Sequence, residues 1–300
     1  MISPKKLKDY WQDINRMTQM KNIVACIDGS KLTLATCEAS AWVAQKVKAP
    51  LTLLHVLDRT TRPVVSELSG QIGFGSQEDL LNELVELDEL RSKVALKHGK
   101  QLLADAEELA QVRGVNDIYK LQRHGSLLET LTDLEESLRL LVIGKSGEDH
   151  GSSNTIGSQL ESVIRTIKAH TLVVSETFEV PSSYMIAFDG SATSDKLIEK
   201  AIKTPLLVGL ECHLVMVNSS GDKSSAFQKA SQQLTEAGLM VTERVLTGHV
   251  DDALLDYQQQ QQLGMIVMGA YGHSKLRQYF VGSNTTQVLI KSSVPLLLIR

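Results

Sequence analysis

The chain has 300 residues, of which 42% are hydrophobic and 22% charged, and its formal net charge is -4. This length suits two globular domains of about 150 residues each, and no apolar run approaches the roughly 18 residues that a membrane span requires. The basic residues are scattered rather than gathered in a stripe, which excludes the surface typical of a nucleic-acid-binding protein. We therefore expect a soluble, cytoplasmic, two-domain protein with neither nucleic-acid nor membrane partners.

Residues 1–20 form an N-terminal extension before the first apolar run. Charges interrupt it throughout, and it lacks the apolar core of a signal peptide. The three cysteines, Cys26, Cys37 and Cys212, show no metal-ligand spacing, and two of them lie in core strand or helix patterns. We predict buried thiols rather than a redox or metal site.

In the first half, short apolar runs alternate with longer helical patterns, as in β-α-β units with a parallel sheet. The predicted strands cover residues 22–28, 51–57, 117–122, 140–144 and 171–175.

A helical insertion, at about residues 60–95, separates the second and third predicted strands. Within it, Leu80, Leu84, Leu87 and Leu90 recur at three- and four-residue spacing and form one apolar stripe on a helix. We interpret this stripe as core or interdomain packing, with a lid over a first-domain pocket as the alternative.

The same order of elements returns after a join near residues 176–183, where Pro181 and two serines interrupt both periodicities. The second set of predicted strands covers residues 184–189, 212–217, 241–246, 265–269 and 294–299. The first strand of each half ends in a related motif, IDGS at Asp28 and FDGS at Asp189, and the two aspartates lie 161 residues apart. The sequence therefore predicts an internal repeat, with a first domain at 21–177 and a second at 183–300, each a doubly wound α/β domain with a parallel five-stranded sheet.

Both halves carry one glycine pattern after the fourth predicted strand: glycine, two residues, glycine, nine residues, glycine and serine. The positions are Gly144, Gly147, Gly157 and Ser158 in the first half and Gly269, Gly272, Gly282 and Ser283 in the second. The first glycine stands at a strand end where a side chain would block a ligand, and the second permits positive φ in a turn whose N–H groups face an anion. The third glycine and the serine precede a helix. The pattern predicts a phosphate-binding loop at a helix N-terminus in each half.

Together with the segments IDGS, FDGS, LVIGKSG, VMGAYGHS and SVPLLLIR, this pattern resembles the universal stress protein family over residues 21–300, in particular its bacterial branch with two fused domains. The resemblance implies two tandem sheets of the adenine nucleotide alpha hydrolase-like class. It also implies that the domains pair through their final strands into an intramolecular pseudo-dimer. The implied ligand is ATP or another adenine nucleotide, with or without magnesium.

The resemblance also assigns roles by position. Asp28 and Asp189 would line the pocket near the ribose, the phosphates or a magnesium ion, although no metal site is certain. Val56 and Val217 would present backbone groups to the adenine. The ribose and phosphates would be surrounded by Gly144, Gly147, Gly157, Ser158, Gly269, Gly272, Gly282 and Ser283. No catalytic residue follows from it.

The two halves differ in the charge of the loop after the second glycine. His273, Lys275 and Arg277 place positive charge beside the second phosphate-binding loop. Glu148 and Asp149 stand in the first loop and repel phosphate unless a divalent metal lies between them. We predict that the second domain binds nucleotide more tightly, the alternative being that these charges are simply solvated.

The sequence thus favours an adenine-nucleotide-binding module that regulates or senses a stress response. One alternative is a partner-binding scaffold in which one or both nucleotide sites are non-functional, and another is a slow ATPase. His124 and His249 occupy similar strand-to-helix turns in the two halves and are candidates for the pocket wall. Association of the whole chain into a homodimer is compatible with these features.

Overall fold

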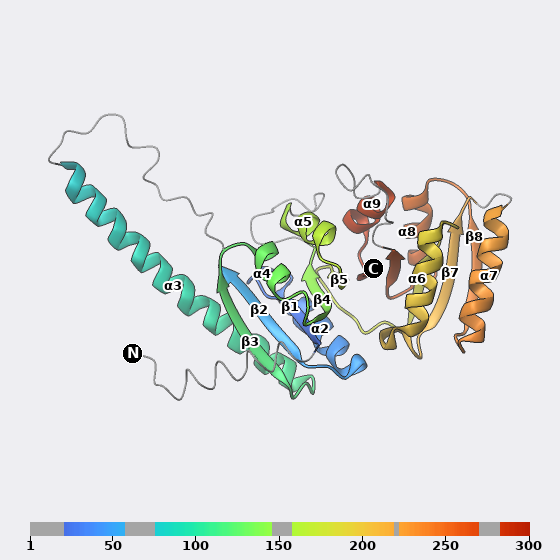
Figure 1. The fold of residues 1–300 in the computed structure, drawn as a ribbon, viewed down its shortest axis with the longest axis horizontal. Helices are drawn as coiled ribbons and strands as arrows, with labels where there is room; N and C mark the ends of the chain where they lie inside the picture. The colour runs from blue at the N-terminus through green and yellow to red at the C-terminus, as the bar shows by residue number, and fades with distance from the viewer. Residues whose placement is uncertain (1–20, 58–75, 146–157, 219–221, 270–282) are drawn as a thin grey trace.

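The computed structural model describes residues 21–57, 76–145, 158–218, 222–269 and 283–300. In these residues the strands form one ten-stranded sheet (Figure 1). The strands are β1 (Asn22–Cys26), β2 (Leu51–Leu57), β3 (Ile118–His124), β4 (Leu138–Gly144), β5 (His170–Val174), β6 (Ser183–Ala187), β7 (Glu211–Val217), β8 (Val241–Leu246), β9 (Ile266–Gly269) and β10 (Leu296–Ile299). Each predicted strand overlaps one of them.

The strand order, β3-β2-β1-β4-β5-β10-β9-β6-β7-β8, places the two halves of the chain side by side with their equivalent strands mirrored about the centre. Pairing is parallel within each half and antiparallel between β5 and β10, where Leu172 lies opposite Leu297. The final strand of each five-stranded sheet therefore pairs with that of the other. This confirms the predicted intramolecular pseudo-dimer.

Helices cover both faces of the sheet. Their bounds are α2 (Thr33–Val47), α3 (Ser76–Val112), α4 (Leu127–Asp133), α5 (Ser158–Thr166), α6 (Ala192–Lys203), η2 (Pro205–Leu207), α7 (Asp222–Glu236), α8 (Val250–Gln260) and α9 (Ser283–Lys291). Because successive strand residues face opposite sides, Ile23 and Ala25 join a core with α2, α3, α6 and α7, whereas Val24 joins a core with α4, α5, α8 and α9. Each half is therefore doubly wound, as predicted.

Polar contacts reinforce the junction between the halves. The Lys145 ammonium and the Ser175 hydroxyl both donate to the backbone carbonyl of Ser292, at 3.1 and 3.2 Å. The backbone N–H of Arg300 donates to His170 Nδ1 at 3.1 Å. These bonds join the ends of β4 and β5 to the last segment of the chain, so the C-terminal strand is fixed by both halves.

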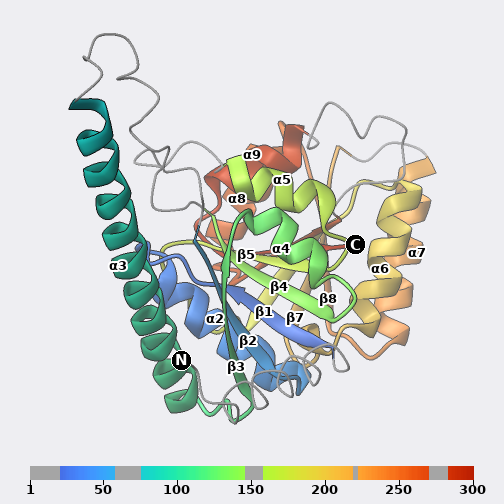
Figure 2. The ribbon, with the colours of Figure 1, turned by 60° about the vertical axis from the view of Figure 1, so that its left-hand side comes forward.

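Helix α3 corrects the interpretation of the leucine stripe. Its second half packs on the sheet, with Leu103 and Ala110 buried, but Leu87 and Leu90 in its first half are 50% and 59% exposed. A 37-residue helix is about 55 Å long, whereas a seven-residue strand spans about 23 Å. The first half therefore extends past the edge of the sheet (Figure 2), and in the described residues it forms neither core nor a lid.

Cys37 and Cys212 are buried and Cys26 is partly buried. Burial raises the pKa of the Cys37 thiol to about 12 and that of the Cys212 thiol to about 11. Burial, and then the neighbouring Asp28 carboxylate, raise the pKa of Cys26 to about 12. All three are free thiols, and they are protonated at neutral pH. Of the helices that the structure describes, none combines the length and apolar character needed to cross a membrane.

Candidate functional site

The parallel register brings the predicted strand-end residues of each half to one edge of the sheet. In the first half Cys26 pairs with Leu54 and Ala25 with Val142, so the chain leaves β1, β2 and β4 at the same level. We call Asp28, Val56 and Gly144 the first strand-end site, and Asp189, Val217 and Gly269 the second strand-end site. The equivalent pairing of β6 with β7 and β9 brings the second set together.

Both strand-end sites lie where the strand order reverses direction, between β1 and β4 and between β6 and β9. In open α/β sheets this is the position at which a crevice forms at the carboxyl ends of the strands. The topology therefore makes these edges the expected ligand positions.

Asp28 organises the loop from β1 into α2. Its Oδ1 accepts a hydrogen bond from the backbone N–H of Ser30 at 3.0 Å, and Gly29 adopts a φ of 85°. The Gly29 N–H donates to Thr33 Oγ1 at 3.1 Å. A turn with positive φ favours glycine, which explains the Asp-Gly-Ser order of the motif.

Asp189 organises the equivalent loop in the second half more tightly. Its Oδ1 accepts hydrogen bonds from the Ser191 N–H, at 2.9 Å, and from the Ser194 hydroxyl. Burial opposes ionisation of Asp189, but the hydrogen bonds from the two serines outweigh it and hold the pKa below its ordinary value. Asp189 is therefore an ionised carboxylate held in a fixed position. Ser194 was missed from the sequence, although its place three residues after Ser191 fits an N-capping hydroxyl pair.

The two sites differ at the glycine that ends the fourth strand. A side chain added at Gly144 would meet Leu32 Cδ1 at 2.9 Å, and Leu32 is 2% exposed. An equivalent side chain at Gly269 would meet no described atom within 4 Å. Gly144 thus packs against Leu32 rather than leaving room for a ligand, whereas none of the described side chains fills the equivalent space over Gly269. Leu32 was also missed, because nothing in its local pattern indicates that it lies over β4.

Several predicted ligand residues lie outside the described residues, namely Gly147, Gly157, Gly272, Gly282, His273, Lys275 and Arg277. Ser158 begins α5 and Ser283 begins α9, as the phosphate-binding hypothesis requires for its helix N-termini. The roles of all these residues remain predictions.

The histidines in the described residues have structural partners or stand at the surface. Nδ1 of His55 lies 2.7 Å from the Ile27 carbonyl, and Nδ1 of His213 lies 2.7 Å from the Tyr257 hydroxyl. His124 ends β3 and His249 caps α8, both exposed. No group of three His, Cys, Asp or Glu residues that could hold a metal ion occurs in the described part of the chain.

A model of the universal stress protein family matches residues 20–175 and 184–300. The chain belongs to the universal stress protein family. A universal stress protein of Synechocystis, Slr1230, is 33% identical over 287 residues, which cover 94% of this chain and all of that protein.

Solved structures support the tandem architecture. A universal stress protein from Archaeoglobus fulgidus aligns with a TM-score of 0.68 at 17% identity, covering 94% of this chain and 99% of that one. A protein of unknown function from Pseudomonas aeruginosa aligns with a TM-score of 0.61 at 16% identity, covering 95% and 94%. At these identities the likeness shows the fold alone, with both universal stress protein halves in place.

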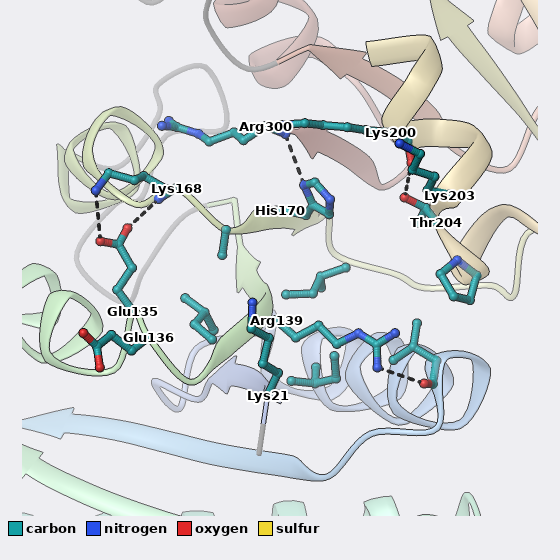
Figure 3. Close-up of a pocket in the computed structure, with 16 residues that line it drawn as sticks. Lys21, Glu135, Glu136, Arg139, Lys168, His170, Lys200, Lys203, Thr204 and Arg300 are labelled. Carbon is teal, nitrogen blue, oxygen red and sulfur yellow. Dashed lines mark hydrogen bonds and ion pairs between the residues drawn. The ribbon is translucent and has the colours of Figure 1, made fainter. Parts of the chain in front are cut away.

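This universal stress protein also has a cavity of about 680 Å³ that sequence analysis did not find. It lies at the opposite ends of the strands, where β1, β4 and β5 begin, and we call it the basic cavity (Figure 3). Its charged and titratable lining residues are Lys21, Glu135, Glu136, Arg139, Lys168, His170, Lys200, Lys203 and Arg300. They come from both halves of the chain, so only the tertiary structure brings them together.

Proposed function

We propose that this universal stress protein is a regulatory or sensing module that binds an adenine nucleotide, chiefly at the second strand-end site. The observation that carries the proposal is Gly269, over which no described side chain packs, at the end of the sheet that also carries an ionised, hydrogen-bonded Asp189. Both stand at a topological switch point, where ligands of open α/β sheets bind. The glycine spacing of residues 269–283 and the start of α9 at Ser283 agree with a phosphate-binding loop.

The first strand-end site is proposed to bind nucleotide weakly. Leu32 occupies the space over Gly144, and the acidic pair Glu148 and Asp149 follows in the sequence. A ligand would have to displace a buried leucine side chain and approach two like charges. The packing of Leu32 and the charge of the loop both favour weaker nucleotide binding at the first strand-end site than at the second.

The residues of the second site suit a nucleotide with or without magnesium. The Asp189 carboxylate can accept a hydrogen bond from a ribose hydroxyl, and the family resemblance assigns backbone groups of Val217 to the edge of the base. One carboxylate together with substrate phosphates is a common magnesium environment, and when bound the ion would shield the phosphate charge. Asp189 would then hold the ion at the strand end.

The proposal is tested with the full chain. Acid extraction of freshly purified protein should release an adenine nucleotide, and saturating Mg-ATP should raise the melting temperature. A ligand at a hundredfold excess over its Kd stabilises the fold by about 2.7 kcal/mol. An extract without nucleotide, combined with an unchanged melting temperature, would contradict the proposal and favour a partner-binding scaffold.

Exchanging the residues at two equivalent positions tests which strand-end site binds the nucleotide. Thr193, half-buried at the start of α6, occupies the sequence position equivalent to Leu32. Thr193→Leu should abolish the tighter binding event in isothermal titration, whereas Leu32→Thr should leave it intact and strengthen the weaker one. Unchanged stoichiometry and affinity in Thr193→Leu would show that the nucleotide does not bind over Gly269.

A further inference from the structure

The first half of α3 leaves an apolar surface uncovered by any described residue. Leu87, Leu90 and Val94 are 50%, 59% and 60% exposed, and Leu84 lies half-buried beside them. Their spacing places the four side chains along one side of the helix, and we call them the apolar stripe. Figures 1 and 2 both show this part of α3 projecting beyond β3.

Such a surface is unusual on a helix that stands apart from the domain core. Most helical stability in proteins comes from tertiary packing of an apolar face, and clustered exposed apolar side chains mark interaction sites. From residue 76 to residue 95 the helix is about 30 Å long, which is enough for more than two heptads of contact.

The charges of the helix identify the kind of partner. Residues 76–89 contain six acidic side chains and no basic one, whereas residues 90–100 contain four lysines and arginines and no acidic one. Two copies side by side in parallel would place the acidic segments together. Two antiparallel copies that cross near residue 87 would instead place the acidic first turns of each helix, residues 76–84, against the basic segment of the other.

We propose that α3 pairs with α3 of a second copy of this chain, antiparallel, through the apolar stripe. A crossing centred on Leu87 sets Leu84 of one copy opposite Leu90 of the other and sets Glu83 opposite Arg91. Apolar positions then meet apolar positions, and two equivalent Glu83–Arg91 pairs of opposite charge lie beside them. The final strands β5 and β10 already pair within the chain, so the second copy binds at a surface other than the one that forms the pseudo-dimer.

The test variants and their control are all exposed residues of α3. Val85 is 58% exposed, and two residues of helix rotate it to the side opposite Leu87. In sedimentation velocity of the full chain from 1 to 100 μM, the wild type should dimerise with rising concentration. Leu87→Lys with Leu90→Lys should raise the dimer Kd about a hundredfold, and Val85→Lys should leave it unchanged.

Charge reversal tests the antiparallel orientation. A chain with Arg91→Glu and a chain with Glu83→Lys should each dimerise more weakly than the wild type, because each sets like charges opposite each other, and a mixture of the two chains should restore association. The substituted side chains are exposed, so each variant should keep the wild-type melting temperature. A wild type that stays monomeric at 100 μM, or Val85→Lys weakening the dimer as much as the stripe variants, would overturn the proposal.

The basic cavity carries a second, independent inference. Six lysines and arginines line it against two glutamates, in a chain whose formal net charge is -4. Glu135 accepts a hydrogen bond from the Lys168 backbone N–H at 2.7 Å and lies 3.7 Å from the Lys168 ammonium. In Figure 3 the glutamates lie at one end beside Lys168, and Lys200 and Lys203 lie at the other. The second end is therefore positively charged.

His170 adds a neutral donor to this end. Its Nδ1 accepts the Arg300 backbone N–H, so the proton of the neutral ring resides on Nε2. We infer that the basic cavity binds a phosphate-bearing small molecule, whose oxygens accept hydrogen bonds from Lys200, Lys203 and His170 Nε2. A volume of about 680 Å³ falls in the range of small-molecule sites.

The test titrates pyrophosphate and AMP separately into the full chain at low salt and follows the ring signals of His170 by NMR. Binding should shift these signals, and Lys200→Gln with Lys203→Gln should weaken it about tenfold or more. Lys196→Gln with Lys229→Gln removes the same charge from exposed positions outside the cavity and should have no effect. Unshifted His170 signals at 1 mM of both probes, or equal weakening by the control pair, would overturn the inference. Neither result depends on nucleotide binding at the second strand-end site.

Discussion

Acidification should destabilise this protein through His170. Burial in the wall of the basic cavity, and then the positive charge of Lys200, lower the pKa of the imidazole from 6.5 to about 4. Protonation would also remove the Nδ1 lone pair that accepts the Arg300 N–H. His170 is therefore protonated at a lower pH in the folded state than in the unfolded chain.

Thermodynamic linkage gives the direction and the magnitude of this change in the free energy of unfolding. Between pH 6.5 and about 4 the unfolded chain carries a proton on His170 that the folded chain lacks, so the free energy of unfolding falls as the pH falls. Each pH unit within this window costs about 1.4 kcal/mol. The loss is about 2 kcal/mol at pH 5 and reaches about 3 kcal/mol below pH 4.

His170→Asn isolates this contribution, because the Asn side-chain oxygen can accept the Arg300 N–H but does not titrate. Urea unfolding of the wild type and the variant at pH 7 and pH 5 should show a stability difference that changes by about 2 kcal/mol in favour of the variant at pH 5. Lys200→Met should raise the pKa of His170 only part of the way, since burial remains. Parallel pH dependences for the wild type and His170→Asn, or an NMR titration of the ring near pH 6.5, would refute the reasoning.

Three further outcomes follow from the described contacts. Cys37 and Cys212, whose pKa values are raised by burial, should resist iodoacetamide at pH 8 and react once urea unfolds the chain, and rapid alkylation of the folded protein in mass spectra would contradict their burial. Ser194→Ala should cost about 1.5 to 3 kcal/mol at pH 7, where it removes a donor to ionised Asp189, and the cost in urea titrations should shrink as acid protonates this carboxyl. Gly190→Ala, at a φ of 75°, should lower stability by about 1 to 2 kcal/mol in the same titrations, and an unchanged midpoint would show that the turn relaxes.

Much of the fold could be read from local patterns. The alternation of short apolar runs with helical periodicity predicted the inner strands, because a strand buried on both faces requires a continuous apolar run. The edge strands β3 and β8 are more exposed and mix polar with apolar residues, and their place in the repeat predicted them. The repeat of Asp28 at Asp189, with equal glycine spacing after the fourth strand, predicted two equivalent domains. These features depend on neighbours in sequence, so they can be predicted without knowledge of the tertiary structure.

Local sequence patterns did not predict how segments far apart in the chain pack together. The leucine periodicity of residues 80–90 correctly predicted a helix but not its environment, because periodicity records which residues share a face and not whether anything covers that face. Likewise the glycine spacing made Gly144 and Gly269 equivalent, and only the placement of Leu32 over Gly144 distinguished them.

The sequence by itself determined the family, the doubly wound halves and the strand-end aspartates, since strand burial, turn chemistry and helix periodicity are local requirements of the chain. The family resemblance already implied that the final strands join the halves. Only the tertiary structure decided that α3 outreaches the strand it packs against, that Leu32 lies over Gly144, and that residues from Lys21 to Arg300 line one basic cavity. Each of these depends on contacts between segments far apart in sequence, and such contacts are set by how completed elements fit together.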